Sequence, residues 1–166
     1  MRMDCGNYCI SRILSNINQK FYSSDFIFSE IFPWVSLLPK IWILLLKYSL
    51  NIEIIHENAE VFVNLNKEEL PLLEEYKYWL NEFEKLWWRY LNNEINIEYL
   101  KEKLKDNYCI ISIKKGEWSH FVILVSIGED NVTLVDNKKW EFSISIDELK
   151  NLINLENWKY VLFIKQ

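Results

Sequence analysis

Glycine, histidine and paired cysteines are scarce in this 166-residue chain, and each scarcity excludes a class of site. The three glycines do not cluster, so no glycine-rich loop is present to cradle a phosphate group. With two histidines and three cysteines, none in a repeated C-x-x-C spacing, the chain has no zinc-ligand pattern. We therefore expect neither a metal ion nor an organic cofactor.

The chain also lacks a surplus of basic residues and a long apolar run. The formal net charge is -5, and basic residues are interspersed with acidic ones, so we expect no nucleic-acid partner. The most apolar run, from Ile41 to Leu46, is far shorter than the ~20 residues that span a membrane. The N-terminus has no secretion-signal pattern and three cysteines cannot all pair, which favours a cytoplasmic protein with reduced thiols.

The residues that are abundant are apolar, and they suffice for the core of one domain over 1–166, since half of the chain is hydrophobic. Apolar residues at helical spacing predict helices over 5–17 and 41–50, and a β-rich run predicts a strand over 52–56. Charged and aromatic residues three or four apart predict one long helix over 67–92, before a shorter helix over 97–104. Because eight tryptophans are many for this length, we expect the aromatic helix 67–92 either to pack in the core or to meet a partner protein.

The last third of the chain has the pattern of an antiparallel sheet. β-Branched and aromatic runs cover 109–113, 120–127, 132–136 and 140–144, with short polar turns between them. Ser145 and Glu148 form a capping-box pattern that predicts a short helix through residue 153, and a last strand follows over 158–164. We expect an α+β fold, with a helical lobe over about 1–107 and an antiparallel β-sheet lobe over about 108–166.

The start of the first helix carries the residues of a nucleophilic site. Cys5 follows Asp4, a suitable N-cap, so its sulfur lies at the positive end of the helix, which favours the reactive thiolate. Gly6 leaves room for a substrate carbonyl, and N–H groups of the first turn can stabilise an oxyanion. Cys9 and Cys109 lie in an apolar stripe and in a strand, and we interpret both as packing residues.

A cysteine nucleophile needs an imidazole within hydrogen-bond reach, and only two histidines are available. His56 ends an apolar strand, and we interpret it as structural. His120 begins a strand and Asp136 ends the next one, so their strand ends can bring a carboxylate against the imidazole. The predicted order is then Cys5, His120 and either Asp136 or its neighbour Asn137.

Three short motifs resemble those of the bacteriocin-processing, double-glycine leader peptidase family: D-C-G at Cys5, H-F-V at His120 and D-N at Asp136. Their order and spacing agree with that family over nearly the whole chain. The resemblance implies a papain-like fold in which Cys5 is the nucleophile, His120 the base and Asp136 the residue that orients the base. It also implies a peptide or acyl-peptide substrate in a cleft between the two lobes.

The chain departs from the family pattern around the oxyanion hole. Family peptidases carry a glutamine several residues ahead of the cysteine, and no glutamine precedes Cys5 here. We therefore expect either a substitute such as Asn7 or Arg2, or poor turnover. Asn137 stands where the family usually has proline, and we expect Gly6, Asn7 and Asn137 beside the substrate. Three functions therefore stay open: a stand-alone peptidase that processes a small peptide or leader, an acyltransferase or peptide ligase that uses the same thioester, and an inactive peptide-binding module.

Overall fold

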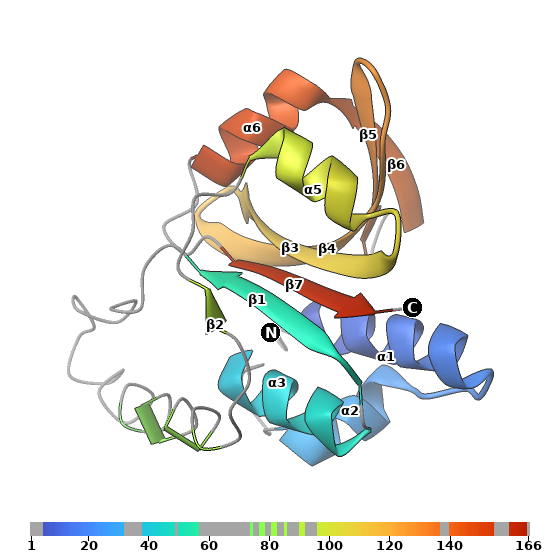
Figure 1. Ribbon diagram of the computed structural model, residues 1–166, viewed down its shortest axis with the longest axis vertical. Helices are drawn as coiled ribbons and strands as arrows, with labels where there is room; N and C mark the ends of the chain where they lie inside the picture. The colour runs from blue at the N-terminus through green and yellow to red at the C-terminus, as the bar shows by residue number, and fades with distance from the viewer. Residues whose placement is uncertain are drawn as a thin grey trace.

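A seven-stranded β-sheet forms the centre of the computed structural model (Figure 1). The structure describes residues 5–31, 38–48, 50–56, 74, 77, 78, 81, 82, 85, 90, 91, 96–136, 140–154 and 160–165. In this part of the chain the strands are β1 (Ile52–His56), β2 (Tyr90–Leu91), β3 (Asn107–Lys115), β4 (Trp118–Ile127), β5 (Asn131–Asp136), β6 (Trp140–Ser145) and β7 (Tyr160–Lys165). Their spatial order is β2-β1-β7-β3-β4-β5-β6, and only β1 and β2 run parallel. The expected α+β class and the meander from β3 to β6 are confirmed.

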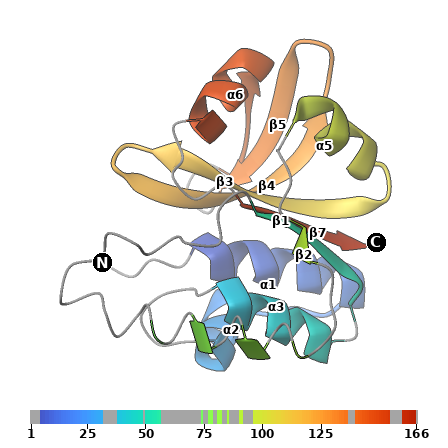
Figure 2. The ribbon, with the colours of Figure 1, turned by 60° about the vertical axis from the view of Figure 1, so that its left-hand side comes forward.

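Helices cover both faces of this sheet, as Figures 1 and 2 show. One face packs against α1 (Cys5–Asn18), α2 (Ser24–Ile31) and α3 (Leu38–Lys47). Together they bury the α1-side cluster, whose members include Ile10, Leu14, Leu45, Ile54 and Leu162. The other face packs against α5 (Ile97–Lys103) and α6 (Ile146–Asn154) and buries the α6-side cluster, whose members include Leu100, Ile111, Val122, Leu149 and Phe163. Helices α1, α3, α5 and α6 each contribute several apolar side chains to their cluster, and this burial stabilises the amphipathic segments. The sheet is therefore shared by two hydrophobic cores.

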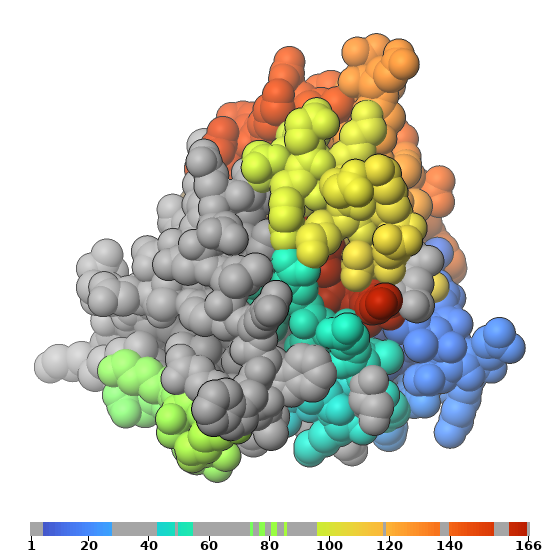
Figure 3. Space-filling view, in the orientation of Figure 1, coloured from blue at the N-terminus to red at the C-terminus, as the bar shows by residue number. Residues whose placement is uncertain are grey.

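Strand β7 has the most complete burial of the sheet. Tyr160, Leu162 and Ile164 belong to the α1-side cluster, whereas Val161 and Phe163 belong to the α6-side cluster. This alternation is the two-residue period of a strand that is covered on both faces. In the space-filling view, β7 is visible only as a small red area beside α5 and β1 (Figure 3).

Local signals locate most helices, with two corrections. Helix α1 agrees with the prediction for 5–17, and the backbone N–H of Glu148 donates to Ser145 Oγ at 3.1 Å, which confirms the cap of α6. Helix α3 begins at Leu38 rather than at Ile41, because a proline is tolerated in the first turn. Helix α2 was not predicted, although Ser23 Oγ accepts from the backbone N–H of Phe26 at 3.0 Å as an N-cap does.

The expected aromatic helix over 67–92 is wrong at its C-terminal end. Tyr90 and Leu91 form β2 and pair with Ile54 and Ile55 of β1, since tertiary pairing overrides helical spacing for aromatic and aliphatic residues. The few earlier positions of this segment that the structure describes are helical, and Tyr78 among them is 56% exposed. The other rings of this segment lie outside the described residues.

The sheet also crosses the boundary expected near residue 107. Strands β1 and β2 come from the predicted helical lobe, yet β1 pairs with β7 over Ile52–His56. Helix α5 likewise precedes the boundary and packs in the α6-side cluster. The two halves of the sequence therefore share one sheet. Among the described residues, no helix has the length and apolar character needed to cross a membrane.

Candidate functional site

The first turn of α1 places Cys5 against the sheet. Cys5 is the first residue of α1 and is partly exposed, and its Sγ accepts a hydrogen bond from the backbone N–H of Phe121 in β4 at 3.5 Å. An N–H donor stabilises negative charge on sulfur, as does the positive end of a helix. The contact joins residues 116 positions apart in the chain, so the tertiary fold, not local sequence, creates the environment of this thiol.

His120 and Asp136 meet on adjacent strands. His120 Nε2 lies 3.2 Å from Asp136 Oδ1, and the two side chains are 11% and 1% exposed. Asp136 is the last residue of β5, as predicted, whereas His120 is the third residue of β4 and not its first. The pairing of Ile123 with Val135 sets this register, which brings the Asp136 carboxylate diagonally across from the imidazole on the same face of the sheet.

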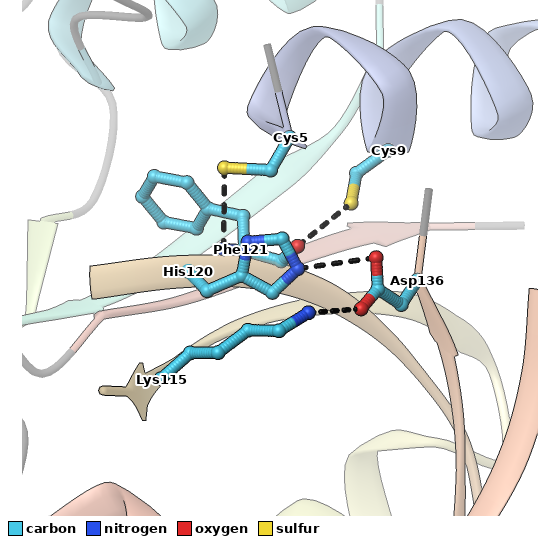
Figure 4. Close-up of polar contacts among 6 residues, drawn as sticks. All are labelled: Cys5, Cys9, Lys115, His120, Phe121 and Asp136. Carbon is cyan, nitrogen blue, oxygen red and sulfur yellow. Dashed lines mark hydrogen bonds and ion pairs between the residues drawn. The ribbon is translucent and has the colours of Figure 1, made fainter. Parts of the chain in front are cut away.

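The three predicted catalytic side chains are brought together where α1 meets β4 and β5. Figure 4 shows the His120 ring between Cys5 and Asp136, with Nε2 toward the carboxylate and the other ring nitrogen on the side of Cys5. A carboxylate 3.2 Å from Nε2 favours this orientation of the ring, with Nδ1 toward the thiol. A thiol, an imidazole and a carboxylate are the groups that acyl transfer through a thioester requires.

Cys9 lies one helical turn after Cys5 and contacts the backbone of the same residue of β4. Its Sγ donates to the carbonyl oxygen of Phe121 at 3.6 Å, and the side chain is fully buried. Burial raises the pKa of the Cys9 thiol well above its usual value of 9.0, and the charges of Cys5 and Asp136 raise it further. Cys9 is thus held as a neutral thiol, as its interpretation as a packing residue requires.

The buried thiols predict that the fold weakens at alkaline pH. Burial raises the pKa of Cys109 as well as that of Cys9, so the unfolded chain loses these protons near pH 9 while the folded protein retains them. Their stabilising contribution is therefore complete below about pH 9 and is lost as the pH rises toward the folded-state values. The free energy of unfolding should fall by about 1.4 kcal/mol per pH unit for each such thiol.

Urea denaturation of the wild type and of Cys109→Ala at pH 8, 9 and 10 measures this loss. The variant should be less stable at pH 8 but should lose less free energy between pH 9 and 10. Equal slopes for the two proteins would contradict the assignment of a protonated, buried Cys109.

Lys115 joins the site although it was not predicted. Its Nζ lies 2.6 Å from Asp136 Oδ2, so the buried carboxylate contacts an ammonium as well as the imidazole (Figure 4). Lys115 ends β3 opposite Trp118, across a two-residue turn in which Gly116 has a φ of 64°. Strand alternation places Lys115 on the same face as Ile113, and this pattern can be seen in the sequence. The contact of Lys115 with Asp136 could be inferred only once the register of the hairpin was known.

The residues expected beside the substrate have different surroundings. Gly6 is buried in the first turn of α1. Asn7 is 0% exposed, and this burial argues against direct contact of its side chain with a substrate. Asp4, Arg2 and Asn137 lie outside the described residues. His56 ends β1, where its backbone pairs with Tyr160 of β7, on a different strand pair from the one that holds Asp136.

No group of three histidine, cysteine, aspartate or glutamate side chains in the described part of the chain is arranged to hold a metal ion. No protein-family model matches the chain, and no curated protein matches its sequence.

Proposed function

We propose that the protein is a cysteine-nucleophile acyl-transfer enzyme with a papain-like architecture, acting as a stand-alone peptidase on a small peptide or leader. The observation that carries the proposal is the 3.2 Å contact between His120 Nε2 and Asp136 Oδ1 beside a helix-terminal Cys5 whose sulfur accepts from Phe121. The resemblance of the D-C-G and H-F-V motifs to leader peptidases supports the same roles. All three cysteines are reduced, which fits a cytoplasmic site of action.

The proposed reaction begins with transfer of the Cys5 thiol proton to His120. The thiolate attacks the carbonyl carbon of the scissile peptide bond, and backbone N–H groups of the first turn of α1 stabilise the oxyanion. The imidazolium then donates its proton to the leaving amine as the C–N bond breaks, which leaves an acyl group on Cys5 Sγ. Water attacks the thioester, His120 takes its proton, and the S–C bond breaks.

Transfer to an amine acceptor uses the same thioester and differs only in the second step. The amine attacks in place of water and loses its proton to His120, so the product is an amide instead of an acid. Mass spectrometry of the product formed in the presence of a peptide amine separates the two reactions, because hydrolysis gives the acid and transfer gives the amide.

Hydrolysis of a peptide ending in Gly-Gly-aminomethylcoumarin tests the proposal directly. The wild type should release the fluorophore and form a Cys5 adduct with a peptide aldehyde of the same sequence. Cys5→Ser should abolish release, whereas Cys109→Ala, which removes a buried thiol of the α6-side cluster, should retain it. A wild type that binds the peptide without cleaving it or acylating Cys5 would instead indicate a binding module.

A further inference from the structure

The carboxylate of Asp136 is held from two sides. Its Oδ1 lies 3.2 Å from His120 Nε2, and its Oδ2 lies 2.6 Å from Lys115 Nζ. The Asp136 side chain is 1% exposed, whereas that of Lys115 is 44% exposed. A buried carboxylate needs partners for its charge, and a charge-assisted hydrogen bond to an ammonium is among the strongest available.

The register of the β3–β4 hairpin accounts for the location of Lys115. Ile113 pairs with His120, and Lys115 follows Ile113 by two residues, so Lys115 and His120 share one face of the sheet. Lys114 projects from the opposite face, and its Nζ donates to the carbonyl oxygen of Glu117 at 3.0 Å. Two adjacent lysines therefore have different environments, and only Lys115 contacts Asp136.

We propose that Lys115 is a positioning residue of the site: its ammonium fixes the Asp136 carboxylate toward His120 and offsets the carboxylate charge that the imidazole experiences. With Lys115 present, Asp136 orients the His120 ring, and the ammonium offsets the carboxylate charge that would otherwise favour the protonated ring. Without Lys115, His120 is the remaining cationic partner at the carboxylate, so the imidazolium is favoured and the site becomes more negative. The loss of positive charge disfavours the Cys5 thiolate and raises the pH at which it forms, whereas an imidazolium that keeps its proton favours the thiolate and offsets part of this effect.

Several charged or titratable groups lie in the neighbourhood of His120. Helix α1 contributes Cys5 and Cys9, β3 contributes Lys115, and β5 contributes Asp136. Arg12, further along α1, is bonded to Tyr8 and lowers the pKa of Cys9 slightly against the stronger effect of burial. Lys115 is the cation of this set that contacts the Asp136 carboxylate, so its removal isolates the proposed effect.

The test is the pH dependence of Cys5 alkylation by iodoacetamide from pH 4 to 9.5, followed by mass spectrometry of the intact protein. Lys115→Met removes the charge but keeps most of the side-chain length, Lys115→Arg keeps the charge, and Lys114→Met removes the same charge from the opposite face. We expect Lys115→Met to move the midpoint of the profile upward by about half to one pH unit. The midpoint for Lys115→Arg should lie close to that of the wild type. Lys114→Met should show less than half of the shift that Lys115→Met shows.

A profile of Lys115→Met that superimposes on the wild type overturns the inference, as does an equal shift in Lys114→Met. NMR titration of the imidazole ring gives a second readout, because the chain has only two histidines and His56→Ala assigns them. The ring of His120 should stay protonated to higher pH in Lys115→Met. The inference rests on the proposed function, and His120→Ala distinguishes the two failures: alkylation indifferent to His120 overturns both, whereas dependence on His120 without a Lys115 effect overturns this inference alone.

Discussion

Replacement of His120 by alanine is expected to slow alkylation of Cys5 at pH 6.5 by about 10- to 100-fold. A thiol with the ordinary pKa of about 8.5 is only about 1% ionised at that pH, whereas an imidazole partner allows the thiolate to form earlier. The lower nucleophilicity of a stabilised thiolate offsets part of the gain, which gives the lower end of the range. The loss in peptide cleavage should be larger, about 100- to 10,000-fold, because His120 also donates the proton to the leaving amine.

The other histidine of the chain gives the matched control. His56→Ala removes the same ring from β1, a strand that pairs with β2 and β7 and not with β4 or β5, so alkylation and cleavage should stay within about twofold of the wild type. The difference between wild type and His120→Ala should also disappear above pH 9.5, where the thiol ionises without help. Equal rates for wild type and His120→Ala at pH 6.5 would contradict the proposed function.

Truncation of Phe163 to alanine is expected to cost about 3–5 kcal/mol of the free energy of unfolding. Phe163 is fully buried in the α6-side cluster at the middle of β7. Its ring makes an edge contact with Tyr99 of α5, with centroids 6.0 Å apart, and Lys103 Nζ lies 5.9 Å from its centroid. Loss of the ring leaves a cavity between the strand and α5 that a strand paired on both edges cannot close.

Urea denaturation at pH 7 measures this loss, with Val125→Ala as a control for truncation of an apolar strand residue. Val125 is 46% exposed at the irregular pairing of β4 and β5, so its truncation should cost less than about 1 kcal/mol. A typical domain has 5–15 kcal/mol of stability, and the Phe163 variant should therefore unfold at a much lower urea concentration. A loss of less than 1.5 kcal/mol for Phe163→Ala would show that α5 does not seal this part of the core.

The parts of the fold that depend on neighbouring residues were predictable from sequence. Helix α1 has an uninterrupted apolar stripe, and strands β3 to β6 alternate with short polar turns, so their types and approximate bounds follow from periodicity. The pairing of β1 with β7 was not predictable, because no local pattern tells which strand lies beside which across about 100 residues. For the same reason Tyr90 was assigned to a helix, although it pairs with β1.

The candidate site divides in the same way. Cys5, His120 and Asp136 could be selected because few residues of the right chemistry exist and their order matches a known motif pattern. No motif distinguishes Lys115 from the other basic residues, of which the chain has nineteen in all, and only the hairpin register shows that it faces Asp136. Asn7 has the right chemistry for an oxyanion donor, yet its complete burial depends on how α1 packs, which composition does not reveal.

The position of β7 between β1 and β3 has a consequence for the order of folding. Strands β3 to β6 can pair by short hairpins, whereas β1 joins the sheet through β7, whose residues follow it by more than 100 positions. Contacts of such long separation form slowly, since closing the loop costs entropy before pairing compensates. The α1-side cluster includes residues of β7, so the packing of α1 on the sheet is completed late in folding. The environment of Cys5 is completed at the same step. A chain that has not reached that step carries an ordinary thiol, so the proposed reactivity of Cys5 requires the completely folded protein.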